Sequence, residues 1–86
     1  MGIKRKGRFF VYMVRCSNGH LYTGYTRNLR RRIREHNTGS RGAKSLRGKK
    51  PVRLVFSKEY KYYLWAVRTE MRIKRLNKKK KEALIQ

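Results

Sequence analysis

The chain has almost no acidic residues, with four glutamates and no aspartate against 26 lysines and arginines in 86 residues. The formal net charge at neutral pH is +22, and a folded chain with so much like charge repels itself and attracts polyanions. Nucleic acid, an anionic membrane surface and an acidic protein are the classes of partner that fit. Nucleic acid is the first expectation from charge alone.

Cysteine, histidine and long apolar runs are also scarce. The single cysteine, Cys16, excludes an internal disulfide and fits a reducing, cytoplasmic environment. With one cysteine and two histidines, the chain lacks the ligands of a typical zinc site. No apolar run approaches the roughly 18 residues of a membrane-spanning helix, and no signal-peptide pattern opens the chain. These absences predict a cytoplasmic protein with no membrane segment.

The length predicts one small domain over 1–86 with a thin hydrophobic core. Residues 1–8 are interpreted as a basic arm, which is either a disordered tail or a contact to phosphates. Residues 78–86 are interpreted as a basic tail with a short helical end. The sequence contains no internal repeat and predicts no oligomeric state.

The strongest local pattern is a β-hairpin. Phe9–Cys16 is apolar on both alternating faces, which predicts a central strand with a layer packed on each side. Ser17-Asn18-Gly19 is a turn signal, and Leu21–Thr26 returns as the second strand.

The register of this hairpin depends on the length of its loop. A two-residue Asn-Gly loop would put Tyr12 and Tyr22 on opposite faces of the hairpin. A three-residue loop with Gly19 left-handed would instead place Tyr12 opposite Gly24 and both phenols on one face. Glycine within a strand is costly unless something needs the space, and the Tyr12 ring is a suitable occupant. The three-residue loop is therefore favoured.

A helix follows the hairpin, with Thr26 or Asn28 as its cap and an end near Asn37 or Thr38. Residues 38–50 are then predicted to form a long polar loop with three glycines and five basic residues. This composition is typical of a loop that binds a nucleic-acid backbone, or of a loop that is only mobile. A third strand is predicted at Val52–Ser57. Its side chains Val52, Leu54 and Phe56 are expected to share one side.

The second predicted helix, Lys61–Leu76, carries a glutamate on its apolar face. Glu70 falls in one stripe with Ala66, Val67 and Ile73. Because an unpaired buried carboxylate is costly, Glu70 needs a cation, a metal or hydrogen-bond donors. A salt bridge to an arginine and a metal site are both open at this point.

Five residues at these spacings can converge on one pocket: Tyr12, Tyr22, Arg32, His36 and Glu70. Singly, each has an ordinary structural role, such as a strand aromatic or a histidine favoured at a helix C-terminus. Together they are what a small phosphodiester hydrolase needs. A carboxylate can hold a divalent metal on the phosphate, and an arginine can take up charge in the transition state. A phenol or imidazole can handle the proton of the attacking water.

The order of these motifs resembles the GIY-YIG nuclease domain. Over nearly its whole length the chain is similar to the small stand-alone bacterial proteins of that superfamily. From the two name-giving triplets only the tyrosine and glycine positions are retained, and every candidate catalytic group is present. The segments that carry the resemblance are Val11-Tyr12-Met13, Tyr22-Thr23-Gly24, Arg32 to Asn37, Gly42-Ala43-Lys44, Pro51 to Val55, Glu70 and Ile73 to Leu76.

The resemblance implies an α+β fold in which helices flank a three-stranded antiparallel sheet, in the order β-β-α-β-α with a short C-terminal helix. It also implies metal-dependent cleavage of DNA. By position, one of Tyr12 and Tyr22 would act with water as general base or position the nucleophile. Arg32 would stabilise the transition-state charge, and His36 would assist proton transfer or contact a phosphate. Glu70 would bind one Mg²⁺ or Mn²⁺.

DNA repair or processing is the expected setting, with RNA and branched, nicked or single-stranded DNA left open as substrates. Family nucleases usually owe their substrate choice to a second domain, and none is expected here, so binding would be electrostatic and steeply salt-dependent. The competing function is a non-catalytic basic module that binds DNA, RNA or the ribosome. It explains the charge equally well but not Glu70 on an apolar stripe. The expected nucleic-acid contacts are Arg27, Arg31, Arg41, Lys44 and Arg47.

Overall fold

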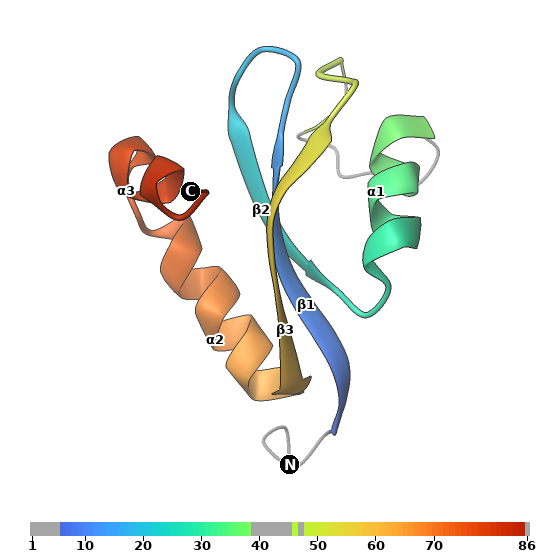
Figure 1. Cartoon of the computed structure of the whole chain (residues 1–86), viewed down its shortest axis with the longest axis vertical. Coiled ribbons are helices and arrows are strands. Elements are labelled where there is room, and N and C mark those ends of the chain that lie inside the picture. The colour runs from blue at the N-terminus through green and yellow to red at the C-terminus, as the bar shows by residue number, and fades with distance from the viewer. Residues whose placement is uncertain (1–5, 39–45, 47, 86) are drawn as a thin grey trace.

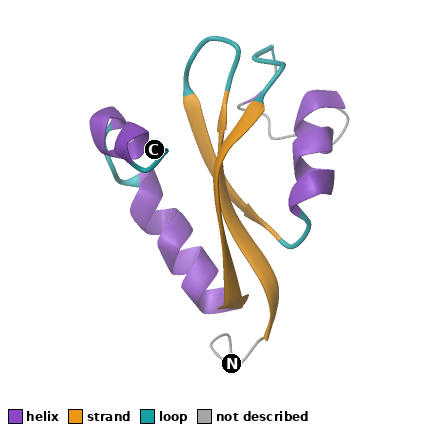
Figure 2. Ribbon diagram, in the orientation of Figure 1, coloured by secondary structure: helices purple, strands orange, loops and turns teal. Residues whose placement is uncertain are grey.

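The computed structural model describes residues 6–38, 46 and 48–85. Helix α1 lies on one face of a three-stranded antiparallel sheet, and α2 and α3 lie on the other (Figure 1 and Figure 2). The predicted α+β class and order of elements are confirmed. The strands, in the spatial order β2-β1-β3, are β1 (Lys6–Arg15), β2 (Leu21–Thr26) and β3 (Arg53–Tyr62); the helices are α1 (Leu29–Thr38), α2 (Tyr63–Lys74) and α3 (Lys78–Ala83).

The central strand β1 supplies side chains to a core on each face of the sheet, as its two apolar faces predict. Successive residues of a strand point to opposite faces, so a run that is apolar throughout suits a position between two layers. On the α2 face the buried members are Phe9, Val11, Met13, Ala66 and Ile73. On the α1 face they are Tyr12, Val14, Cys16, Leu46 and Val52.

The hairpin has the three-residue loop that the sequence favours. The backbone of Cys16 donates to the carbonyl of His20 at 2.8 Å, and Gly19 has φ of +89°, the left-handed region. This loop sets the register in which Tyr12 lies opposite Gly24 and Val14 opposite Tyr22. Both phenols therefore lie on the α1 face of the sheet.

Helix α1 is fixed at both ends by asparagines. At the start, the Oδ1 atom of Asn28 accepts a hydrogen bond from the backbone of Arg31 at 3.0 Å, so Asn28 is the cap. At the end, the side-chain amide of Asn37 donates to the Val52 carbonyl at 3.1 Å, and its oxygen accepts from the Val52 N–H at 2.7 Å. The amide of Asn37 thus pairs with the backbone just before β3 and holds α1 against the sheet.

The third strand is longer than the predicted Val52–Ser57. Its backbone pairs with β1 as far as Tyr62. The second half of the strand contains several polar residues, which are tolerated because β3 is an edge strand. The register shifts at Val55, since Leu54 lies opposite Val14 and Phe56 lies opposite Met13. This irregularity puts Leu54 and Phe56 on opposite faces, so the prediction that they share a side is wrong.

The second helix starts at Tyr63 rather than Lys61, because β3 continues directly into it, and it ends at Lys74 rather than Leu76. The basic run that was expected to precede a helical end itself forms α3. The Oδ1 atom of Asn77 caps this helix by accepting from the backbone of Lys80 at 2.9 Å. None of the helices in the described part of the chain is long and apolar enough to cross a lipid bilayer.

The C-terminal helix is joined to the hairpin by a two-pronged ion pair. The Nη atoms of Arg15 donate to both carboxylate oxygens of Glu82 at 2.6 and 2.7 Å. At the other end of the chain, Lys6–Arg8 belong to β1 rather than to a separate arm, and residues 1–5 lie outside the described part.

Replacing Gly24 by alanine should displace the Tyr12 ring. A Cβ atom there would lie 2.6 Å from the Tyr12 Oη and 2.8 Å from its Cζ. Because Tyr12 is buried, we expect the free energy of unfolding in urea to fall by about 1–3 kcal/mol, the usual cost of overpacking. The NMR resonances of the His36 ring, which contacts Tyr12, should also shift.

Gly19→Ala is the matched control, since its Cβ would meet nothing within 4 Å and its cost is backbone strain at positive φ. This variant should lose stability and leave the His36 resonances in place. A Gly24→Ala protein with unchanged His36 resonances would contradict the close contact with Tyr12.

Candidate active site

The Tyr12 ring crosses β2 over Gly24 and reaches α1. Because Gly24 has no side chain, the ring can lie close against the β2 backbone. Its hydroxyl lies 2.8 Å from the Nε2 of His36, in a hydrogen bond that joins β1 to α1. Both side chains are only 1% exposed. The bond therefore lies inside the protein and not on its surface.

Tyr22 completes a cluster of three rings with Tyr12 and His36. The ring centroids of Tyr22 and His36 are 5.5 Å apart with the rings nearly perpendicular, and those of the two tyrosines are 6.4 Å apart. Edge-to-face packing of this kind orients each ring against its neighbours. Tyr22 is only partly buried, so it is the member of the cluster that reaches the surface.

Burial sets the protonation states of the two buried members. Removal from water, with a further contribution from Tyr22, raises the pKa of Tyr12 to about 12. Burial also lowers the pKa of His36, and the nearby positive charge of Arg32 lowers it further. At neutral pH Tyr12 is therefore a phenol and His36 a neutral imidazole. When the imidazole proton is on Nδ1, the Tyr12 hydroxyl donates to Nε2.

Arg32 lies beside the ring cluster and is held by a glutamate of its own helix. Its Nη1 donates to the Oε1 of Glu35 at 2.9 Å. A hydrogen-bond interaction with Arg32 also lowers the pKa of Tyr12, which opposes the larger effect of burial. The Arg32 side chain is 27% exposed, so the guanidinium is available at the surface while Glu35 limits its movement.

Glu70 belongs to α2, in the other layer of the fold. Its side chain is 17% exposed, and its Oε2 lies 3.2 Å from the Nζ of Lys74, one turn further along the helix. Of the two alternatives left open by the sequence, a salt bridge is present, with a lysine as partner instead of an arginine. The negative charge of Glu70 also contributes slightly to the raised pKa of Tyr12, so the carboxylate is within electrostatic range of the phenol.

Four of the five predicted site residues are therefore brought together by direct contacts, and Glu70 is linked to them by electrostatics. Sequence reasoning missed Glu35, which contacts both Arg31 and Arg32. Its signal was the position three residues after Arg32 on the same helix, in a chain with only four acids.

The expected nucleic-acid contacts divide between described and undescribed parts of the chain. Arg27, two residues before α1, and Arg31, on α1, are both exposed. Arg31 pairs at 3.6 Å with Glu35, which has Arg32 as its nearer partner. Arg41, Lys44 and Arg47 lie outside the described residues.

The donor set fits a weakly coordinated divalent cation better than a closed metal cage. Within the described residues no three His, Cys, Asp or Glu side chains lie together in a group that could hold a metal. A single carboxylate such as Glu70 is nonetheless a normal protein ligand for Mg²⁺, which keeps several waters and takes further oxygens from a substrate phosphate. Lys74 Nζ would have to leave Glu70 Oε2 for this to occur.

The sequence and the fold are both similar to those of known proteins. The family model described as the GIY-YIG catalytic domain matches residues 8–83. A UPF0213 protein of Halobacterium salinarum is 47% identical over 86% of this chain and 95% of its own, and one of Klebsiella pneumoniae is 44% identical over 90% and 72%. The solution structure of a UPF0213 protein from Bacillus halodurans is 40% identical, with a TM-score of 0.60 over 91% of this chain and 82% of the other.

The buried neutral His36 should make stability depend on pH below neutrality. Its folded pKa is lowered, so below the unfolded value of about 6.5 the unfolded chain binds more protons and is favoured. The free energy of unfolding is therefore highest above the unfolded pKa of His36 and decreases as the pH falls from about 7 to 5. Arg32 strengthens this effect, while the opposing charge of Glu35 weakens it.

Urea unfolding of the wild type across this pH range measures the effect. His36→Gln should flatten the dependence, whereas His20→Gln, a change at an exposed histidine near the hairpin loop, should retain it. A dependence that persists in His36→Gln would assign it to another group.

Proposed function

The chain belongs to the GIY-YIG family, and from that premise we propose that it is a metal-dependent endonuclease that hydrolyses DNA phosphodiester bonds. The observation that carries the proposal is the hydrogen bond between Tyr12 and His36, with Arg32 and Tyr22 beside it. These are the groups that such a reaction needs, and they come from three separate elements of the fold.

Exposure divides the cluster into a contacting pair and a supporting pair. Tyr22 and Arg32 reach the surface, so they contact the scissile phosphate and the attacking water. Arg32 takes up negative charge that grows on the phosphoryl oxygens in the transition state, and Glu35 keeps its guanidinium oriented for this. Tyr12 and His36 lie behind them.

The buried pair handles the proton released by the attacking water. His36 is neutral at physiological pH because its pKa is lowered, so it can accept a proton. The Tyr12 hydroxyl, with its pKa near 12, stays protonated and connects His36 to the site. As the water attacks, its proton passes through the Tyr22 hydroxyl to the Tyr12 oxygen, while the proton of Tyr12 passes to Nε2. His36 thus becomes an imidazolium, and neither tyrosine keeps a net charge.

Glu70 is the residue that would hold a divalent cation, Mg²⁺ or Mn²⁺. When bound, such an ion supplies positive charge to the phosphate oxygens. The Glu70 carboxylate forms an ion pair with Lys74 in this structure. The exposed Lys74 side chain can move away when the cation binds. This position accounts for a half-buried acid in a chain that has so few.

The extreme positive charge and the family premise favour a role in DNA repair or processing in the cytoplasm, with RNA as an alternative substrate. One observation supports a second function. Tyr12 and His36 are each 1% exposed, an arrangement that also suits a rigid core in a protein that binds nucleic acid without cutting it.

Cleavage of labelled single-stranded and duplex DNA with added Mg²⁺ or Mn²⁺ tests the proposal. Glu70→Gln should reduce the rate at least about 10²-fold, the order found when one charge-stabilising group is removed from an active site. Binding measured in EDTA should stay comparable to that of the wild type. Tyr12→Phe, which keeps the ring over Gly24 and removes the hydroxyl, should also reduce the rate.

Glu82→Gln is the matched control, because it makes the same change in charge on α3, where the carboxylate pairs with Arg15. It should cut at the wild-type rate. A wild-type protein that binds DNA but cuts none under any of these conditions would leave the non-catalytic binding module as the function.

A further inference from the structure

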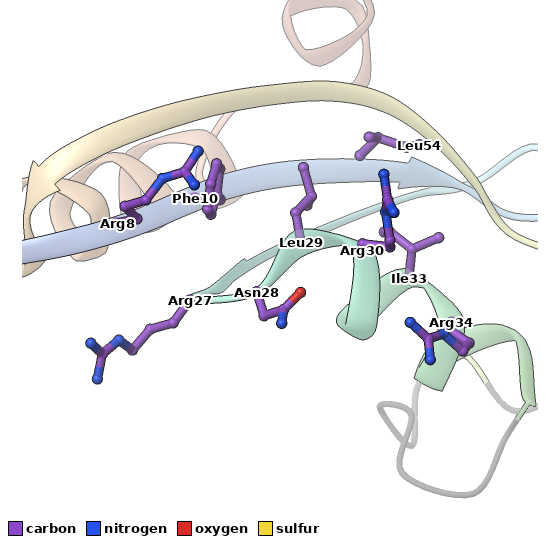
Figure 3. A pocket seen from close by; sticks show the side chains of 9 residues that line it. All are labelled: Arg8, Phe10, Arg27, Asn28, Leu29, Arg30, Ile33, Arg34 and Leu54. Atoms are coloured by element: carbon purple, nitrogen blue, oxygen red, sulfur yellow. The ribbon is translucent and has the colours of Figure 1, made fainter.

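A groove lies between α1 and the sheet, and it is not formed by the tyrosine cluster. It has a volume of about 890 Å³, within the usual range of ligand sites, and Figure 3 shows its lining side chains from close by. Neither tyrosine of the cluster, nor Arg32 or His36, is among the described residues that line it. The face of α1 that lines this groove borders the one that carries Arg32 and His36, since Leu29 and Ile33 also pack against the buried cluster that includes Tyr12.

The floor of the groove is apolar. Its lining includes Leu29 and Ile33 of α1, Phe10 of β1 and Leu54 of β3, with Phe10 and Leu54 at opposite ends (Figure 3). Leu54, at the end of the floor away from Phe10, is 39% exposed, so this end of the floor is open to solvent. A hydrated phosphate backbone does not match such a surface, whereas the face of a planar base does.

A planar guanidinium group lies over Phe10, the aromatic residue of the floor. The guanidinium of Arg8 lies 5.4 Å from the centre of the Phe10 ring. Arg8 is held by Glu59, to which its Nε and Nη2 donate at 2.9 and 3.2 Å. Arg8 and Phe10 therefore form one side of the groove, in an arrangement that suits stacking of flat, electron-rich rings.

The helix side of the groove is basic. Arg30 and Arg34 line it, are exposed and lie four residues apart on the same side of α1. Arg27 also borders the groove, just before α1, but its guanidinium lies 5.4 Å from the centre of the Phe9 ring. All four glutamates of the chain pair with other basic residues, and no ion pair is found for these three arginines within the described part. Arginines so placed are suited to phosphate oxygens.

We propose that this groove binds an unpaired stretch of nucleic acid, with bases packed along the floor between Phe10 and Leu54 and phosphates on Arg30 and Arg34. A duplex does not fit this chemistry, because its base faces are stacked inside and only phosphates and base edges are presented. The inference rests on the proposed function and names its substrate class, a nucleic acid with an unpaired segment beside the cleaved bond. Helix α1 then contacts the substrate on two faces.

Fluorescence anisotropy in EDTA, with a labelled single strand and a duplex of the same length, tests the groove without cleavage. Phe10→Leu should weaken single-strand binding about fivefold or more, since stacking of one base on an aromatic ring contributes that order of affinity. Leu54→Thr should weaken it by a smaller factor, because it removes apolar contact and no aromatic ring. Duplex binding should change little. The two variants are independent, and Leu54→Thr alters an exposed strand position that tolerates substitution.

A double change tests the basic side. Arg30→Gln with Arg34→Gln should weaken single-strand binding and reduce the slope of log K against log salt by about 1 to 2. The control is Arg68→Gln with Arg72→Gln, which removes the same charge from the exposed surface of α2, outside the groove. The control should lower single-strand affinity less than the groove variant does. It should also lower the affinities for the single strand and the duplex by the same factor.

The inference is overturned if the groove variants behave like the α2 control, or if they weaken single-strand and duplex binding by the same factor. Its failure is distinguishable from failure of the proposed function. A protein that cuts DNA while the groove variants match the control keeps its function and loses this site. A protein that cuts nothing but loses single-strand binding in Phe10→Leu and Leu54→Thr keeps the site and loses the nuclease function.

Discussion

The contact between Tyr12 and Gly24 determines the geometry on which the candidate site depends. The missing side chain at Gly24 leaves room for the Tyr12 ring against β2, and from there the hydroxyl reaches His36 on α1. The register that brings the two residues opposite each other is set by the turn at Gly19. Two strands and a helix are thus aligned by a turn, by the missing side chain at Gly24 and by one buried hydrogen bond. This alignment does not depend on Arg32 or on a substrate.

Much of this arrangement was predictable because it follows from short-range sequence patterns. The turn signal and the strand glycine select one hairpin register, and the spacing of Arg32 and His36 puts them on one face of a helix. The full length of β3 was not predictable, because its second half is rich in polar residues and is held by backbone pairing with β1. The faces of Leu54 and Phe56 were not predictable either, because the register shift at Val55 reverses the alternation of side chains. A short C-terminal helix was predicted, but its start in the lysine run was not. It is joined to the hairpin by Arg15 and Glu82, residues too far apart in the sequence for a local pattern to show the pair.

The site shows the same division between local and tertiary information. The tyrosines, Arg32 and His36 were recognised from spacing, and the structure brings them into contact. Glu70 was recognised as an acid on an apolar stripe, but its position in the opposite layer and its pairing with Lys74 depend on how α2 packs. The groove at Phe10 and Leu54 had no sequence signal at all, because it exists only where α1 leaves part of the sheet uncovered.

The four glutamates have a consequence for how the protein meets a polyanion. Each is already engaged with a lysine or arginine, so none of them is left to repel an approaching phosphate chain. Attraction of this kind brings the two molecules together quickly but selects no orientation, since it acts from every side and over a Debye length of roughly 8–10 Å. Alignment must come from contacts that work only at short range. The uncharged features of the surface, the exposed edge of Tyr22 and the apolar floor between α1 and β3, are therefore what can convert an unselective encounter into one productive pose.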